Sequence, residues 1–314
     1  MKSGMSLAGL LGCMVLLASC GGGGGGATSG TPTPTPNPTP TPTPTPNPTT
    51  GEIRPPADAV VAASRMDLIV NGTTTSNRFA LLAPHDFSLT FDPANAQYHL
   101  TDPDNSAVFG SAQFTKETSV PDFFPRVEWE SHATSTDDYL VIFKAPNATP
   151  PVTPRYGAYG AWQHNSNSGG GPFGVRLIYF AYGSPTPSGS MPHTGRVTYR
   201  IVGTANYADD SRLFFAQTDT LVTVDFVAGT VSGTVALTGA DFFGDNLGGL
   251  LGVSLPSTIN GNVVDAPLSS TIATLTGQFH LQFLGPNADE LELTYEGNDP
   301  REAFAGAAIG TRQN

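Results

Sequence analysis

Apolar and polar residues alternate along most of the chain after residue 185, and this period of two is typical of β-strands. In one such segment Val222, Val224 and Phe226 share a face, while polar residues occupy the other. A strand with one buried and one solvated face belongs to an antiparallel sheet. The pattern predicts strands at residues 196–201, 221–227, 230–237, 278–283 and 290–296.

Two of these segments form a predicted hairpin, with Ala228 and Gly229 as a two-residue turn between them. In residues 290–296 the leucines and a tyrosine face the core, and the glutamates face outward into solvent. Repeated antiparallel strands with glycine-rich turns favour a closed barrel, because closure removes the unpaired edges of a sheet. We therefore expect an all-β fold with a barrel in the second half of the chain.

The first half is less regular, and clusters of proline and asparagine separate short predicted strands. Residues 146–154 form a proline-rich loop, and residues 163–174 form a loop between two strands. Residues 58–66 are the best candidate for a short helix. The predicted strands lie at residues 78–82, 86–91, 108–114, 127–130, 139–144, 156–162 and 175–182.

The N-terminus has the features of a secretory signal, with Lys2, an apolar run at residues 7–17 and small residues before Cys20. The sequence Leu-Ala-Ser-Cys at residues 17–20 resembles the bacterial lipobox. The resemblance implies that the signal peptide, residues 1–19, is removed and that Cys20 is lipidated. The alternative is an ordinary secretory signal that is cut elsewhere. The apolar run is too short for a membrane-spanning helix, which needs about 20 residues.

Residues 20–52 are predicted to be a tether between the lipid anchor and a folded remainder. Threonine–proline repeats at residues 31–50 exclude helix and sheet, because proline fixes φ and lacks a backbone donor. In a polyproline-II conformation, at about 3.1 Å per residue, this stretch reaches about 60 Å. The remainder is predicted to divide near residue 185, into a β domain at residues 53–185 and a barrel at residues 186–314.

The net charge excludes some classes of binding partner, and the cysteine count excludes disulfides from the folded part. The formal net charge is -12, which argues against nucleic acid and against electrostatic docking on anionic lipid. The chain has two cysteines, Cys13 in the signal and Cys20 at its end, so the folded part has no disulfide. Its stability therefore depends on the packing of its core.

Candidate chemical motifs are weak. Residues 169–174 fit the G-x-G-x-x-G pattern, but their polar and proline-containing context indicates a loop and not a nucleotide site. Residues 102–105 are similar to the start of a calcium loop but lack its glycine and distal glutamate, so a turn is favoured. The six histidines show no metal-ligand spacing, and no nucleophile elbow is present. We expect no metal, no cofactor and no enzymatic activity.

Several ordered motifs resemble the β-barrel of the transferrin-binding protein B family. They are Tyr-Gly-Ser-Pro-Thr at residues 182–186, Met-Pro-His-Thr-Gly and Val-Thr-Tyr within residues 191–199, residues 223–233, Phe-Leu-Gly-Pro-Asn-Ala-Asp-Glu at residues 283–290, and Phe-Ala-Gly at residues 304–306. The resemblance covers residues 182–314. It implies a lipid-anchored surface protein with a handle-like β domain followed by an eight-stranded antiparallel barrel. Position 21, directly after Cys20, is a glycine and not an aspartate. By resemblance to bacterial sorting signals, this implies that the lipoprotein goes to the outer membrane.

The family implies binding at the cell surface, where loops capture a protein or a carrier-bound nutrient of the iron- or haem-acquisition type. Phe123, Phe124 and Trp129 are the predicted partner contacts, because aromatic side chains near prolines are frequent binding hot spots. The alternative is that these aromatics fill the core of the first domain. Two other functions stay open: a haem-binding module, in which His193 would be a ligand, and a glycan-binding or structural envelope protein.

Overall fold

The computed structural model describes residues 54–55, 59–71, 74–78, 86–118, 126–132, 136–143, 153–166, 173–209, 213–240, 246–255, 257–270 and 275–313. Within these residues the elements are strands, apart from one short 3-10 turn, η1 (Ser188–Ser190). The predicted all-β class is confirmed. No helix in this part of the chain is long and apolar enough to cross a bilayer. Cys20, the tether, Phe123 and Phe124 lie outside the described residues.

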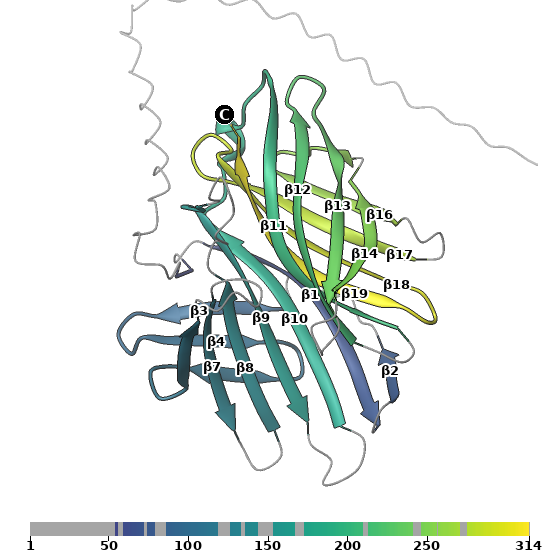
Figure 1. Cartoon of the computed structure of the whole chain (residues 1–314). Coiled ribbons are helices and arrows are strands. Elements are labelled where there is room, and N and C mark those ends of the chain that lie inside the picture. Colours follow the sequence, from purple (N-terminus) through teal and green to yellow (C-terminus); the bar gives the residue numbers. More distant parts are fainter. Residues whose placement is uncertain are drawn as a thin grey trace, which may run out of the picture. The chain divides into compact units, whose positions relative to one another are not determined.

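A seven-stranded antiparallel sheet forms the larger part of what we call the handle (Figure 1). Its order is β2-β1-β10-β9-β8-β7-β6, so the first strand lies beside the last strand of the handle. The two pair along almost the whole length of β1, from Val60 opposite Gly183 to Val70 opposite Phe173. The strands are β1 (Val60–Asn71), β2 (Thr74–Arg78), β6 (Phe114–Thr118), β7 (Arg126–His132), β8 (Thr136–Phe143), β9 (Gly157–Ser166) and β10 (Phe173–Gly183).

A three-stranded sheet covers one face of this larger sheet and completes the handle. It consists of β3 (Ser88–Asp92), β4 (Gln97–Thr101) and β5 (Ser106–Phe109). Aromatic rings fill the space between the two sheets. The ring of Phe87 stacks on Phe180 at 5.4 Å between centroids, and Tyr98 meets Trp129 edge-on at 5.2 Å.

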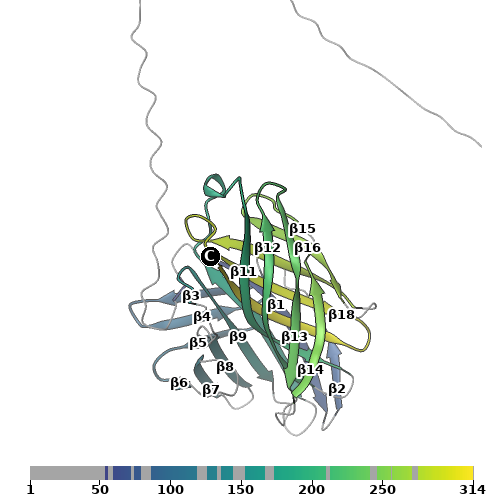
Figure 2. The ribbon, with the colours of Figure 1, turned by 45° about the horizontal axis from the view of Figure 1, so that its top comes forward.

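The rest of the described chain is an eight-stranded, nearly closed antiparallel barrel, as expected (Figure 2). Each strand pairs with the next in the ring, and β11 pairs with β19 to close it. The weakest seam joins β14 and β16, through Val253 opposite Ser270 and Ser254 opposite Ser269. The strands are β11 (Arg196–Ala208), β12 (Leu213–Asp225), β13 (Thr230–Ala240), β14 (Asn246–Ser254), β16 (Val263–Ser270), β17 (Thr276–Leu284), β18 (Glu290–Asn298) and β19 (Ala303–Arg312), with a short β15 (Ser257–Thr258) beside β13.

The barrel wall is buried on both sides where the handle lies against it. Side chains of β18 and β19 such as Leu293 and Phe304 fill the barrel interior. From the outer face of the same wall, Ala305 and Ile309 pack with Tyr179 of the handle sheet in a second core. The described fold therefore has three packed layers: the small sheet, the large handle sheet and the barrel wall.

The predicted helix at residues 58–66 is wrong, because residues 60–66 belong to β1. Side chains in it alternate between buried and half-buried positions, as in Ala62, Ser64 and Met66, which all face the same way. Alanine favours a helix by only a fraction of a kcal/mol per residue, and a continuous ladder with β10 outweighs that preference.

Three smaller expectations also differ from the structure. Residues 108–114 are not one strand but the end of β5, a turn and the start of β6. The predicted loop at residues 163–174 is shorter, because β9 continues to Ser166 and β10 begins at Phe173. The hairpin of β12 and β13 is present, but Phe226–Gly229 connect the strands, since the Asp225 carboxylate accepts the backbone N–H groups of Val227 and Ala228 at 3.0 and 2.9 Å.

Candidate functional site

Two of the motifs that carry the family resemblance, residues 182–186 and 283–290, meet at the junction of handle and barrel. The Thr186 hydroxyl donates to the Gly285 carbonyl at 2.7 Å, and the Thr186 N–H donates to the Phe283 carbonyl at 2.8 Å. Ser184 donates its N–H to Tyr156 at 2.9 Å and accepts the N–H of Gly285 at 3.0 Å. Three segments that are far apart in sequence are therefore tied together by their backbones.

Gly285 is required at this junction. Its φ is +80°, a left-handed conformation that favours glycine. A Cβ at this position would lie 2.7 Å from the Tyr156 ring, which is closer than carbon atoms approach. The Tyr199 hydroxyl donates to the Ala288 carbonyl at 2.5 Å and fixes the rest of the turn. These motif residues thus hold handle and barrel together, and none of them forms an open contact surface.

Glu290, the last residue of that motif, joins the two parts through its carboxylate. The side chain belongs to β18 and is 3% exposed. Its oxygens accept three successive backbone N–H groups at the entry to β9, from Arg155 at 2.5 Å, Tyr156 at 3.0 Å and Gly157 at 3.1 Å. These three hydrogen bonds lower the pKa of Glu290. The burial of the carboxyl group has the larger effect and raises the pKa to about 7.

Glu290 is the first of three acids in a row along the outer face of β18. The sequence predicted that these acids face solvent, but Glu290, Glu292 and Glu296 are all buried because the handle covers them. Glu292 is fully buried, and neither of its carboxyl oxygens has a hydrogen-bond partner among the described residues. Burial raises its pKa well above the ordinary range, and raises the pKa of Glu296 to about 7.

Glu296 lines a cleft of about 500 Å³ between β1 of the handle and the outer wall formed by β16, β17 and β18. Its carboxylate accepts the Gln278 amide at 3.1 Å and the Arg65 backbone N–H at 3.3 Å. On the barrel side His280 Nδ1 pairs with the Asp265 carboxylate at 2.6 Å. The Nε2 atom of His280 is buried without a described partner. The cleft thus brings an acid of the barrel wall and a histidine–aspartate pair beside the edge of β1.

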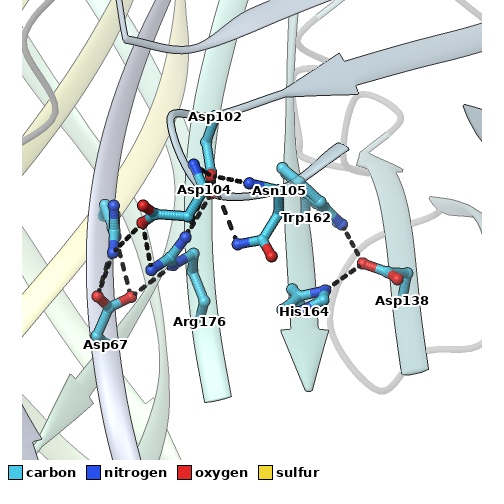
Figure 3. A network of polar contacts seen from close by, with 9 residues as sticks. Asp67, Asp102, Asp104, Asn105, Asp138, Trp162, His164 and Arg176 are labelled. Atoms are coloured by element: carbon cyan, nitrogen blue, oxygen red, sulfur yellow. Dashed lines mark hydrogen bonds and ion pairs between the residues drawn. The ribbon is translucent and has the colours of Figure 1, made fainter. Parts of the chain in front are cut away.

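A second polar cluster ties the small sheet of the handle to the large one (Figure 3). Arg176 of β10 reaches three carboxylates: Asp67 at 3.0 Å, Asp102 at 2.9 Å and Asp104 at 2.9 Å. Asp102 is 4% exposed, and its Oδ1 also accepts the N–H groups of Asp104 and Asn105, each at 2.7 Å. Residues 102–105 thus form the expected turn. No group of ligands suited to a metal ion occurs in the described part of the chain.

Replacing Arg176 with leucine is expected to lower the free energy of unfolding by about 3–5 kcal/mol, because it leaves the buried Asp102 carboxylate without its cation. The matched control is Arg200→Leu, which breaks the surface pair with Asp219 and is expected to cost at most about 1 kcal/mol. Urea unfolding of both variants measures the difference. Equal losses would show that the handle network contributes no more than a surface ion pair.

The predicted partner contacts are only partly described. Trp129 is 5% exposed and packs against Tyr98 and Phe114 in the handle, which is the placement that the core alternative requires. Phe123 and Phe124 belong to the connection between β6 and β7, outside the described residues. His193, considered as a haem ligand, is exposed after η1. Residues 169–172 of the glycine-rich motif also lie outside, and its last two residues begin β10.

No family model matches the chain, and no curated protein matches it. Its fold resembles that of transferrin-binding protein B. An intact transferrin-binding protein B with N and C lobes is 15% identical, with a TM-score of 0.45 and a match over 80% of this chain and 46% of that one. A double mutant of transferrin-binding protein B from Haemophilus parasuis is 16% identical, with a TM-score of 0.46 and coverage of 81% and 45%.

The N-lobe of lactoferrin-binding protein B from Moraxella bovis is 11% identical, with a TM-score of 0.33, and the match covers 80% of this chain and 99% of that lobe. The chain therefore spans less than half the length of the two transferrin-binding proteins B. At these identities the likeness is one of fold. The roles of Glu290, Glu292 and Glu296 follow from the geometry of this chain itself.

Proposed function

We propose that this protein is a lipid-anchored outer-membrane lipoprotein that binds, at the cell surface, a protein or a carrier-bound nutrient of the iron- or haem-acquisition type. The observation that carries the proposal is a lipobox and a long tether in front of a handle joined firmly to a barrel. In this role the chain binds and does not catalyse. The names of the similar solved structures agree with such a partner.

The firm joint has a physical consequence for binding. The Glu290 carboxylate, the hydrogen bond from the Gly285 N–H to the Ser184 carbonyl and the second core hold handle and barrel in one orientation. Loops from both parts are then presented in a fixed relation, so less conformational entropy is lost when a partner binds. We propose that the handle, residues 53–185, and the barrel, residues 186–314, both contribute loops, with Phe123 and Phe124 among the contacts.

The tether provides reach from the membrane. A polyproline-II segment of the length of residues 31–50 holds the domain at up to about 60 Å from the anchored Cys20. This distance lets a surface domain extend beyond neighbouring molecules. The acidic balance of the chain, -12, favours a partner with a basic surface.

The first test is protease treatment of intact cells that express the full chain. We expect loss of the folded part without lysis, and release of the protein into the medium when Cys20→Ser removes the acylation site. Protection until the outer membrane is broken would overturn surface capture. A second test measures capture of a labelled iron carrier by intact cells. The double variant Phe123→Ala, Phe124→Ala is compared with the control Phe114→Ala in the handle. The comparison tests whether capture depends on the β6–β7 connection.

A further inference from the structure

The edge of β1 beside the cleft is only partly paired. β10 pairs with β1 from Val60 to Val70, whereas β2 pairs only with the stretch from Asp67 to Asn71 on the other side. The N–H of Arg65 points away from β10, since it reaches the Glu296 carboxylate at 3.3 Å. Because backbone groups alternate along a strand, Val61 and Ala63 present their N–H and C=O groups on that same side. No described residue pairs with them there.

The chain itself does not extend the β2 ladder along this edge in the described structure. The ladder ends with Arg78 opposite Asp67. The next backbone donor on that side belongs to Arg65, and the Glu296 carboxylate already accepts it. Glu296 thus ends the pairing with β2 and leaves the edge at Val61 and Ala63 facing the cleft, where Ala62, Ala63 and Ser64 form the wall.

The chemistry of the cleft is that of an acceptor site. Glu296 is 5% exposed and its described partners are an amide and a backbone N–H, both neutral. No lysine or arginine is among the described residues that line the cleft. On the opposite wall the Asp265 carboxylate is 65% exposed. A buried acid without a cation is costly, and a cation placed beside it recovers part of that cost.

His280 adds a further acceptor. Its Nδ1 pairs with Asp265, so in the neutral ring the proton lies on Nδ1 and the lone pair on Nε2. The Nε2 atom is buried and has no described partner. Pro267 provides apolar surface between these acceptors. Carboxylates and a ring nitrogen around apolar walls suit an aliphatic stem that ends in a cationic group.

We propose that this cleft is a docking site for an extended basic peptide segment, which adds a strand to the free edge of β1 and places a lysine or arginine beside Glu296. Backbone pairing with Val61 and Ala63 supplies part of the affinity, and the acidic walls select the side chain. The cleft volume, about 500 Å³, fits a short segment. Residues 79–85, which follow β2, contain no lysine or arginine and so do not meet this requirement. The inference goes beyond the proposed function and does not depend on it.

The test uses the purified full chain in detergent and the blocked peptide acetyl-Val-Lys-Val-Lys-Val-amide. One control peptide carries norleucine in place of lysine, a second carries glutamate, and cadaverine represents a free alkylamine. Calorimetry is expected to show binding of the lysine peptide at least tenfold tighter than of each control. Equal binding of the norleucine peptide would overturn the charge requirement, and equal binding of cadaverine would overturn strand addition. No binding of the lysine peptide at millimolar concentration would overturn the site.

Two variants and one control locate the binding. Glu296→Gln keeps an oxygen acceptor for Arg65 and is expected to abolish the preference for lysine over norleucine. Ala63→Pro removes a backbone N–H donor from the edge of β1 and is expected to weaken binding of the lysine peptide at least tenfold. Asp219→Asn, on the barrel wall at β12, is expected to change nothing. Amide hydrogen exchange in the unmodified chain covers the case in which a variant fails to fold: the lysine peptide must slow exchange at Val61 and Ala63, and unchanged exchange there rejects the proposal.

Discussion

Replacing Glu290 with alanine is expected to lower the free energy of unfolding at pH 6 by about 3–5 kcal/mol. The carboxylate accepts three backbone N–H groups from Arg155, Tyr156 and Gly157, and alanine would leave them buried without an acceptor. Each such group costs roughly 1–3 kcal/mol. Denaturant unfolding of the full chain measures the loss.

Two variants separate this role from a general effect of removing a carboxylate. Glu290→Gln keeps one acceptor oxygen and is expected to fall between the parent and the alanine variant. Asp92→Ala removes a carboxylate that caps an exposed turn at Ala94 and is expected to change stability little. A loss in Glu290→Ala no larger than in Asp92→Ala would contradict the role of Glu290 as the joint.

Denaturant unfolding can also show whether handle and barrel unfold together, because of where the tryptophans lie. Both tryptophans of the chain, Trp129 and Trp162, lie in the handle, so fluorescence follows the handle while circular dichroism follows all strands. In the parent the two transitions are expected to coincide, as in a cooperative unit. In Glu290→Ala the fluorescence transition is expected to come first, because the handle has lost three of its hydrogen bonds to β18.

The protein is expected to lose stability as the pH rises from about 4.5 to 7 and beyond. Glu290 and Glu296 have an ordinary pKa of 4.5 and a folded-state pKa of about 7, so in this window the folded chain binds more protons than the unfolded chain. Stability therefore falls with pH, by on the order of 3 kcal/mol for each of these groups. Glu292, with a pKa raised still further, extends the loss to higher pH.

Glu292→Met is the sharpest test of this dependence. Methionine fills a similar volume without a carboxyl that lacks hydrogen bonds, so the free energy of unfolding at pH 8 is expected to rise by about 2–4 kcal/mol. Glu292→Gln is expected to give a smaller gain, because its amide still lacks partners. Asp219→Asn, which removes an exposed carboxylate from the same barrel, is the control for a general effect of losing a carboxyl group. A steeper loss above pH 7 in Glu292→Met than in the parent would refute the explanation.

Clear alternation predicted the barrel strands β11, β12, β13, β17 and β18, whereas β14, β16 and β19 lack so clear a pattern and were not predicted from it. The turn after Asp225 and the strands of the β17–β18 hairpin follow from local residues. The burial of Glu292 does not follow, since alternation reports which side of a strand a residue faces, and not what covers that side. The large handle sheet lies over the outer face of the barrel at β18, and no pattern within residues 290–296 predicts that cover.

The same limit explains the misread first strand and the missed cleft. Ala62 and Ala63 look suited to a helix in isolation, and only pairing with β10, far along the chain, makes them a strand. The cleft depends on Arg65 meeting Glu296 across a sequence separation of 231 residues, which no local pattern encodes. For Trp129, in contrast, the residue type alone was informative. Its large apolar ring made burial in the core an alternative to partner contact, and it is 5% exposed.

The position of β1 also bears on how the fold carries mechanical load. With the proposed anchor at Cys20, tension from the membrane would enter the folded part near Arg54, whose guanidinium lies 4.5 Å from the centre of the Phe91 ring, and would then reach β1. Pulling β1 out requires breaking its ladder with β10 together with the bond from the Ser64 hydroxyl to Gly306 of the barrel. A force between the proposed anchor and a bound partner would therefore be resisted by both the handle and the barrel, and not by one peripheral strand alone.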